Sequence, residues 1–388
     1  MQEEQILTVN RLNVKLEIEQ KSYSVVEDVS FALIKGKTLA IVGESGCGKT
    51  MTALSIMRLL SNPPVLPAIG EVLYKGQNLL TISEKEMRKI RGGRIAMIFQ
   101  DPSSALNPVY RIGDQLLESV ALHRGLYGDE AISCVIEALR EVHIASPEER
   151  LMDYPHQMSG GMKQRIMIAM ALIGEPDILI ADEPTTALDV TIQLQVLDLI
   201  RHLQQKNRMA VLLITHDMGV VAEMADEVVV MYAATQVESG TVTQIFDHMA
   251  HPYTVGLFHS RPSGVSERGD LHAIKGSVPS IKNYPTGCRF HPRCPFVMEK
   301  CKNQAIPNFV IERVVKLPSS LGKQSGKDGR AFDDSMAKAI DEEKDVPDLP
   351  ECDARGTGSF TIPSTNGELS HKAKCLLYDG QQDAPKFT

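Results

Sequence analysis

Residues 39–50 read Leu-Ala-Ile-Val-Gly-Glu-Ser-Gly-Cys-Gly-Lys-Thr. The apolar run 39–42 predicts a buried strand, and the glycine-rich stretch after it predicts a loop leading into a helix. Glycines let consecutive backbone N–H groups turn toward one anion, and the helix adds its positive N-terminal end. Lys49 can reach the β- and γ-phosphates of a nucleotide, and the Thr50 hydroxyl can bind Mg²⁺. The stretch predicts a nucleoside triphosphate site made of Gly43, Glu44, Ser45, Gly46, Cys47, Gly48, Lys49 and Thr50.

A second apolar strand, 178–181, ends in the acidic pair Asp182 and Glu183. At the carboxyl end of a strand in a doubly wound sheet, such a pair lies beside the phosphate loop. We expect Asp182 to hold Mg²⁺ through water. We expect Glu183 to polarise the attacking water, a role worth about 10²–10⁴-fold in rate. His216 ends the apolar strand 211–214, where its imidazole can contact the γ-phosphate. A solvated carboxylate pair and a structural histidine are the alternatives, and the order of the motifs along the chain disfavours both.

A third phosphate-binding pattern begins at Ser159, a favourable helix N-cap that two glycines follow. It lies far along the chain from the first loop, so it need not contact the same nucleotide. Together with Gln100 in Ile-Phe-Gln-Asp-Pro (98–102), these motifs resemble the ATP-binding cassette (ABC) family. The resemblance implies that Gln100 senses Mg²⁺ and water and couples to a membrane partner. It also implies a signature loop that contacts the nucleotide of the opposite subunit, formed by Ser159, Gly160, Gly161 and Met162.

A closer resemblance, to the ATPase subunits of bacterial dipeptide and oligopeptide importers, rests on four stretches: 101–108, 159–165, 251–254 and 287–295. It implies an ATP-hydrolysing subunit that drives uptake of peptides or related small solutes. The implied partners are a second, identical or similar ATPase subunit, two transmembrane permease subunits and an extracytoplasmic solute-binding protein. The chain would then lie at the cytoplasmic face of the cell membrane, as a peripheral subunit. The rival functions are a soluble ABC ATPase outside transport and an ATP-switched, metal-binding regulatory module.

The fold expected for the nucleotide-binding domain, 1–258, is α/β, a P-loop NTPase core. Apolar spacing near 3.6 predicts helices over 112–124 and 130–142 with no strand between them. We therefore expect a helical signature subdomain over about 103–165. Strands and helices then alternate to about residue 242, which favours a parallel sheet.

The remainder, 259–388, is expected to be a small irregular extension that contains cysteines and a flexible, polar insertion over about 316–370. In the resembled subunits a fourth cysteine precedes an aliphatic-tyrosine end, which Cys375 matches. Four thiolates suit a [4Fe–4S] cluster, with Cys288, Cys294, Cys301 and Cys375 as ligands. Cys352 is the alternative fourth ligand; zinc and free thiols are the alternatives to the cluster.

Two observations concern the surroundings of this cysteine group. Arg289, Arg293 and Lys374 supply positive charge that can offset the charge of a cluster. No sequence feature links the extension to the phosphate chemistry, so we expect loss of the cluster to loosen the extension more than it slows catalysis.

The composition limits the other functions. The net charge is −8 at pH 7, which argues against nucleic acid as the main ligand because phosphate contacts need a basic surface. The basic run 88–91 is expected to be a solvated face. No apolar run approaches the ~20 residues that span a bilayer, and the first residues do not resemble a signal peptide. Tyr23 is the nearest aromatic residue that can stack on adenine, with an ordinary surface tyrosine as the alternative.

Overall fold

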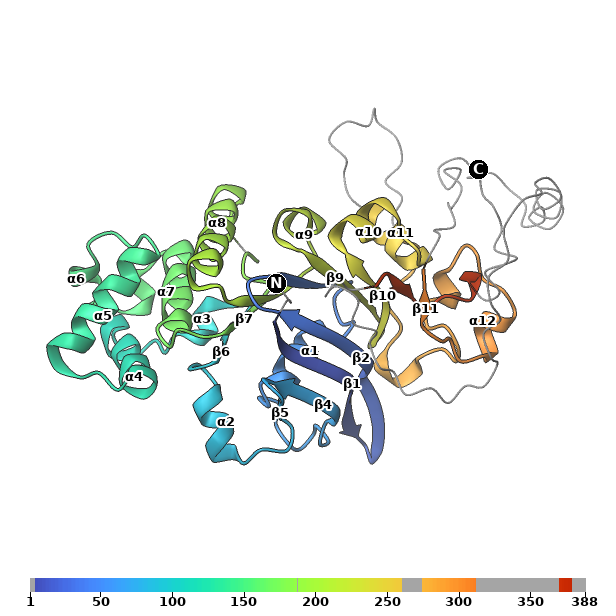
Figure 1. Cartoon of the computed structure of the whole chain (residues 1–388), viewed down its shortest axis with the longest axis horizontal. Coiled ribbons are helices and arrows are strands. Elements are labelled where there is room, and N and C mark those ends of the chain that lie inside the picture. The colour runs from blue at the N-terminus through green and yellow to red at the C-terminus, as the bar shows by residue number, and fades with distance from the viewer. Residues whose placement is uncertain (1–3, 187, 260–273, 312–369, 379–388) are drawn as a thin grey trace.

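The computed structural model describes residues 4–186, 188–259, 274–311 and 370–378 (Figure 1). Ten strands follow one another across the sheet in the order β5-β4-β1-β2-β10-β9-β3-β8-β7-β6. Their bounds are β1 Gln5–Ile18, β2 Lys21–Ile34, β3 Thr38–Val42, β4 Ile69–Tyr74, β5 Gln77–Asn78, β6 Ile95–Ile98, β7 Ile178–Asp182, β8 Ala210–Thr215, β9 Glu227–Tyr232 and β10 Thr235–Thr241.

The central strands β6, β7, β8, β3 and β9 are parallel neighbours, and every residue in them is buried. A parallel strand covered on both faces is a continuous apolar run, which is why the sequence predicts these strands well. Their carboxyl ends carry the phosphate loop after β3, the acidic pair at β7 and His216 after β8.

The prediction of a parallel sheet is only partly correct, because the sheet is mixed: β10 is parallel to β2, but the other pairs outside the central strands are antiparallel. β1 pairs antiparallel with β2 and β4, and β9 pairs antiparallel with β10. Two-residue turns, Glu19–Gln20 and Ala233–Ala234, join two of these pairs, and all four turn residues have positive φ, from 45° to 70°. Turns this short permit only antiparallel neighbours, since a parallel crossover needs a dozen or more residues.

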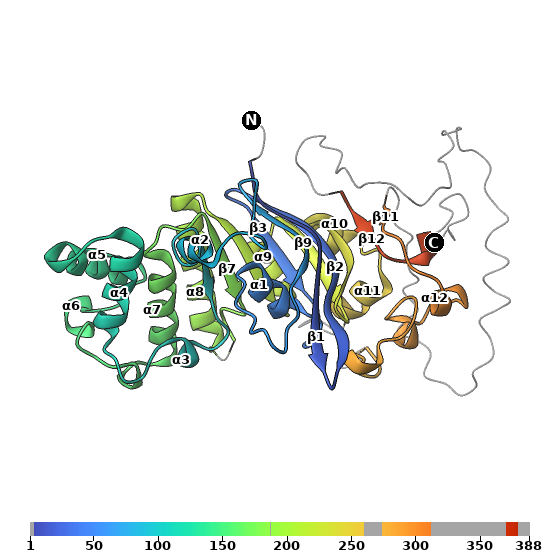
Figure 2. The same cartoon turned by 90° about the horizontal axis from the view of Figure 1, so that it is seen from below.

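Helices α3 to α7 lie together toward one end of the molecule (Figures 1 and 2). Helix α4 has the predicted bounds 112–124, and α5 covers 128–141 where 130–142 was predicted. No strand interrupts residues 103–165. The helices of the described residues are α1 Lys49–Ile56, α2 Glu84–Ile90, α3 Pro102–Ala105, α4 Ile112–Arg124, α5 Gly128–Glu141, α6 Pro147–Arg150, α7 Gly160–Leu172, α8 Val190–Asn207, α9 Met218–Met224, α10 Val242–Asp247, α11 Pro252–His259 and α12 Lys300–Asn303.

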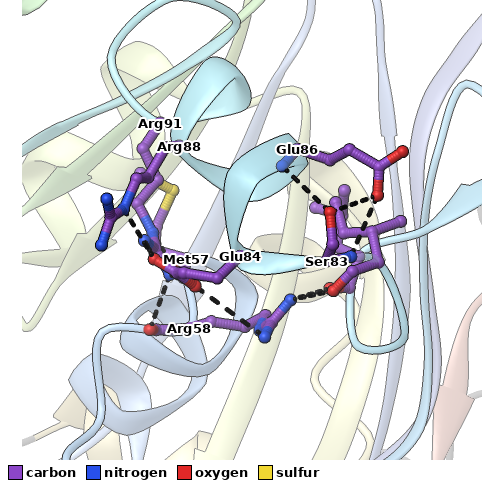
Figure 3. Close-up of polar contacts among 9 residues, drawn as sticks. Met57, Arg58, Ser83, Glu84, Glu86, Arg88 and Arg91 are labelled. Carbon is purple, nitrogen blue, oxygen red and sulfur yellow. Dashed lines mark hydrogen bonds and ion pairs between the residues drawn. The ribbon is translucent and has the colours of Figure 1, made fainter.

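Helix α2 supports the C-terminal end of α1, the helix that begins at the phosphate loop (Figure 3). Arg91 donates from Nε to the Met57 carbonyl at 2.7 Å and from Nη2 to the Arg58 carbonyl at 3.0 Å. Its Nη1 also donates to Glu84 at 2.6 Å. The last carbonyls of a helix have no hydrogen-bond donors within the helix, and Arg91 donates to two carbonyls at this end of α1. The basic run 88–91 is therefore only partly the solvated face that was predicted.

The extension returns to the sheet through two short strands, β11 Phe309–Val310 and β12 Lys372–Ala373. Strand β12 pairs with both β10 and β11, and the Ile311 N–H donates to the His371 carbonyl at 2.8 Å. Residues 311 and 371 are thus neighbours in space, although they are 60 positions apart in the sequence (371 − 311). The predicted insertion, apart from Ser370, and Cys352 lie outside the described residues.

Candidate nucleotide-binding and hydrolysis site

The phosphate loop packs against two strands so closely that two of its positions admit only glycine. A Cβ at Gly43 would lie 2.2 Å from the Met231 carbonyl oxygen, and one at Gly48 would lie 2.5 Å from that of Val25. Both glycines also have positive φ, 151° and 105°. Strands β9 and β2 therefore fix the path of the loop from both sides.

The side chains of Lys49 and Thr50 are held at the start of α1. The buried Lys49 ammonium donates to the carbonyls of Gly43 at 2.8 Å and Glu44 at 3.1 Å. The Thr50 hydroxyl donates to Asp182 Oδ1 at 3.2 Å. The predicted loop and the predicted Mg²⁺ carboxylate are thus in direct contact.

Asp182 and Glu183 occupy different environments although they are neighbours in sequence. Asp182 ends β7 and is 2% exposed. Burial, with a smaller effect of the Glu183 charge, raises the pKa of Asp182 above its ordinary value. Glu183 has a φ of +47°, and its N–H donates to the Ile214 carbonyl of β8 at 2.8 Å. This backbone conformation is uncommon for a residue with a side chain, and such outliers concentrate at functional sites.

The Glu183 carboxylate brings three polar side chains together. Gln100 donates to Oε2 at 2.8 Å, Thr186 donates to the same oxygen at 2.9 Å, and His216 Nδ1 lies 3.2 Å from Oε1. Burial opposes the charge, but hydrogen bonds from Thr186 and His216 outweigh it and hold the pKa of Glu183 below its ordinary value. The three residues predicted to be catalytic, Gln100, Glu183 and His216, therefore meet at one carboxylate.

Thr186 belongs to this group, and the sequence analysis gave it no role. It lies three residues after Glu183, and its own N–H donates to the Glu183 carbonyl at 3.1 Å. A hydroxyl three residues after a glutamate is common, so only the tight turn at Glu183 identifies it. Of the predicted Mg²⁺ ligands, Thr50 and Asp182 touch each other, whereas Gln100 contacts Glu183.

The signature loop has the predicted N-cap at Ser159, and it lies away from the phosphate loop of the same chain. Ser159 caps α7, and its Oγ accepts from the Met162 N–H at 3.3 Å. A Cβ at Gly161 would lie 3.1 Å from Ile192 Cγ2 of α8. Ser159 and Gly160 are exposed. Both views place α7 at the helical end of the molecule and α1 near its middle (Figures 1 and 2).

Tyr23 lies on β2, two residues before Val25, whose carbonyl borders Gly48. Residues two apart share a face of a strand. The Tyr23 side chain is half-buried.

Four cysteines of the extension line one small cavity. Aromatic and apolar side chains complete its wall, among them Phe290, Phe296 and Leu376, and the cysteines are Cys288, Cys294, Cys301 and Cys375. Burial raises the pKa of Cys288 and Cys375, and raises that of Cys294 to about 12. Strand β12 carries Cys375 to this cavity. In the described part of the chain, no three His, Cys, Asp or Glu side chains converge on a single-ion site.

The basic residues near these cysteines form ion pairs with carboxylates far away in the sequence. Arg289 pairs with Glu27, Arg293 with Glu44, and Lys374 with Asp28. All three carboxylates belong to the nucleotide-binding domain. The extension is therefore linked to that domain, and through Glu44 to the phosphate loop itself. No sequence pattern indicates this link, because Arg293 and Glu44 are 249 positions apart.

Comparison with known proteins identifies the family. The family model described as "ABC transporter" matches residues 26–186. A probable peptide ABC transporter ATP-binding protein from Sinorhizobium fredii is 49% identical over 300 residues, which cover 77% of this chain and 90% of that protein. The chain belongs to the ATP-binding proteins of ABC transporters.

Other similarities agree with this family. The model described as "Oligopeptide/dipeptide transporter, C-terminal region" matches residues 237–301 of this ABC ATPase. The dipeptide transport ATP-binding protein of Bacillus subtilis is 51% identical over 300 residues, covering 77% of the chain and 89% of the relative. The predicted resemblance is thus confirmed, and the chain is an ATPase of the transport class rather than of either rival class.

Solved structures share the fold. The cbiO1 protein of Clostridium perfringens, titled as part of an ABC transporter complex, is 27% identical with a TM-score of 0.54, covering 63% of this chain and 92% of that one. The dimeric ATP-binding cassette MJ0796, bound to ADP and Pi, is 24% identical with a TM-score of 0.54, covering 61% and 98%. The described helices include none that is both long and apolar enough to cross a bilayer.

Proposed function

We propose that this ABC ATPase hydrolyses ATP at the carboxyl edge of β3, β7 and β8, with Glu183 as the group that activates water. The observation that carries the proposal is the contact of Gln100, Thr186 and His216 with the one Glu183 carboxylate. A lowered pKa keeps this carboxylate ionised at neutral pH, as a proton acceptor must be.

The other predicted residues have distinct roles in this proposal. Residues 43–48 surround the phosphates with backbone N–H groups, and Lys49 leaves its loop carbonyls to contact the β- and γ-phosphates. Thr50 and Asp182 hold Mg²⁺, which neutralises charge on the phosphates; their contact at 3.2 Å supports this pairing. Gln100 joins that ion to the Glu183 region, and Tyr23 stacks on adenine.

The test separates binding from hydrolysis. Glu183→Gln keeps the size and hydrogen-bonding of the side chain but removes its basicity, so we expect MgATP affinity within about threefold of wild type and a fall in kcat of at least about 100-fold. Thr186→Ala is the comparison variant: it removes one hydrogen bond to Glu183 and leaves the base, so we expect a smaller fall in kcat than in Glu183→Gln. Undiminished turnover in Glu183→Gln would refute the assignment.

We further propose that the ATPase drives import of peptides or related small solutes. The 237–301 match to the oligopeptide/dipeptide C-terminal model and the peptide-transport names of the relatives support this solute class. The proposed complex contains a second ATPase subunit, two permease subunits and a solute-binding protein. In it the chain is peripheral, at the cytoplasmic face of the membrane.

We propose that ATP lies between the phosphate loop of one subunit and Ser159–Met162 of the other. The exposure of Ser159 and Gly160, and their separation from α1, support this arrangement. We propose that the helical subdomain, about 103–165, and Gln100 couple closure of the dimer to a conformational change of the permeases. The domain boundary at 258 is retained in this proposal.

We propose that Cys288, Cys294, Cys301 and Cys375 hold a [4Fe–4S] cluster rather than a single zinc ion. The four line one cavity with several apolar and aromatic side chains and with His251 and His291, and their grouping there supports this ligand set. Each thiolate of a four-iron cluster binds its own iron, so the sulfurs are spread around it. When bound, the cluster would hold α12, the 288–294 turn and β12 together.

Anaerobic purification followed by iron, sulfide and zinc analysis tests this assignment. We expect about four irons and four sulfides per chain, and loss of both in Cys375→Ser. A chain with one zinc, or with neither metal, would overturn the cluster and leave the ATPase proposal intact.

A further inference from the structure

Glu44 places a carboxylate on the loop that we propose surrounds a triphosphate. An unpaired negative charge there would repel the ligand. The structure pairs it with Arg293 in two parallel hydrogen bonds, Nη1 to Oε2 at 2.7 Å and Nη2 to Oε1 at 3.0 Å. This bidentate geometry is the strongest form of such a pair.

Arg293 is fixed on its other sides as well. Its side chain is 6% exposed. Its Nε donates to the Lys275 carbonyl at 3.0 Å, and its guanidinium lies 5.7 Å from the centre of the Tyr232 ring. The Glu44 charge holds the Arg293 pKa above its ordinary value in spite of burial. Arg293 therefore reaches Glu44 already oriented, with little side-chain freedom to lose.

An aromatic cluster that includes Tyr232 also contacts the backbone of the phosphate loop. Tyr232, Tyr253 and Phe290 contact one another, with ring centres 4.7 to 5.4 Å apart. The Tyr253 hydroxyl accepts from the Glu44 N–H at 2.8 Å. The backbone and the carboxylate of Glu44 are thus both held, the backbone by α11 and the carboxylate by the 288–294 turn.

We propose that Arg293 is a positioning residue of the nucleotide site: it neutralises Glu44 and holds the first turn of the phosphate loop in the form that accepts MgATP. The proposal goes beyond the hydrolytic roles above, because it makes the cysteine-bearing extension part of the phosphate site. It rests on the chain binding ATP and not on what metal, if any, the cysteines hold.

The first test measures nucleotide affinity by calorimetry with MgATP. Arg293→Gln leaves the Glu44 charge unpaired, so we expect its Kd to rise about tenfold or more. The double variant Glu44→Gln with Arg293→Gln removes both charges, so no unpaired carboxylate faces the triphosphate, and we expect it to restore the affinity to within about threefold of wild type. Equal Kd values for the single and double variants would overturn the proposal.

Ionic strength distinguishes electrostatic positioning from simple loss of structure. Repulsion from an unpaired Glu44 is screened by salt, so the ratio of the Arg293→Gln Kd to the wild-type Kd should fall as KCl is raised. A purely structural defect would leave that ratio constant. The KM for ATP should rise while kcat at saturation stays within about threefold, because Glu183 and its partners are not altered.

Arg289→Gln is the matched control. It lies on the same turn and pairs with Glu27 of β2, which is outside the phosphate loop. If Arg293 acts through Glu44, Arg289→Gln should change the MgATP Kd by less than about threefold. An increase equal to that of Arg293→Gln would mean that docking of the extension, and not the Glu44 pair, controls affinity, and the proposal would fail.

Discussion

At the residue scale, Glu183 illustrates how a strained backbone serves a site. With φ at +47°, it turns away from β7 just after Asp182, so that adjacent carboxylates point to different partners. Asp182 contacts Thr50, whereas Glu183 contacts Gln100, Thr186 and His216. The result is one carboxylate whose pKa is raised and one whose pKa is lowered, side by side in sequence.

Tyr23 supplies a prediction at the same scale. If its ring stacks on adenine, Tyr23→Ala should raise the Kd for MgATP about tenfold, because stacking on an aromatic side chain is worth ~1–3 kcal/mol per base. Tyr23→Phe keeps the ring and should bind as wild type does. Competition with a fluorescent nucleotide measures both. An unchanged Kd in Tyr23→Ala would assign Tyr23 to the ordinary surface of β2.

At the element scale, α1 is supported at both ends. Its first turn follows directly on the phosphate loop, which strands β2 and β9 hold in place. The carbonyls at its C-terminal end accept hydrogen bonds from Arg91, as Figure 3 shows. A helix of eight residues has little stability alone, so contacts with its neighbours must hold it.

Arg91→Ala should therefore destabilise the domain. We expect a loss of about 2 kcal/mol, because two charge-assisted bonds to backbone carbonyls disappear and leave those carbonyls half-buried. Arg88→Ala is the control: its side chain is 77% exposed, and we expect a change within about 0.5 kcal/mol. Urea unfolding followed by circular dichroism measures both. Equal losses would show that the Arg91 contacts add no stability.

At the scale of the whole molecule, the site is divided between distant parts. The phosphate loop and Glu183 lie at the middle of the sheet, the signature loop lies at the helical end, and the extension reaches Glu44 from the opposite end (Figure 2). In the arrangement we propose, a nucleotide bound at α1 of one chain is enclosed by the signature loop of a second chain. Two chains arranged head to tail satisfy this for both sites.

Mixing two inactive variants tests this arrangement. Lys49→Ala removes nucleotide binding, and Ser159→Arg blocks the signature loop, so neither should hydrolyse ATP alone. A mixed dimer contains one intact pair of phosphate loop and signature, so an equal mixture should recover about a quarter of wild-type ATPase activity if the sites are independent. No recovery, from variants that still dimerise, would place the signature in the same chain as the nucleotide it serves.

The sequence alone determined the family, the order of the motifs, the buried parallel strands and the helical segment, because these depend on local spacing: glycine before a helix, apolar runs of five or six residues, and a 3.6-residue period. It also singled out Gln100, Glu183 and His216, which the structure brings together, but it did not single out Thr186. It did not determine the mixed sheet, since a two-residue turn of Ala233–Ala234 carries no glycine or asparagine to mark it. Nor did it determine the partners of the arginines in the extension. Arg293 finds Glu44 only because α11, β9 and the cysteine-bearing turn pack around one aromatic cluster, and packing between distant segments leaves no periodic trace in the chain.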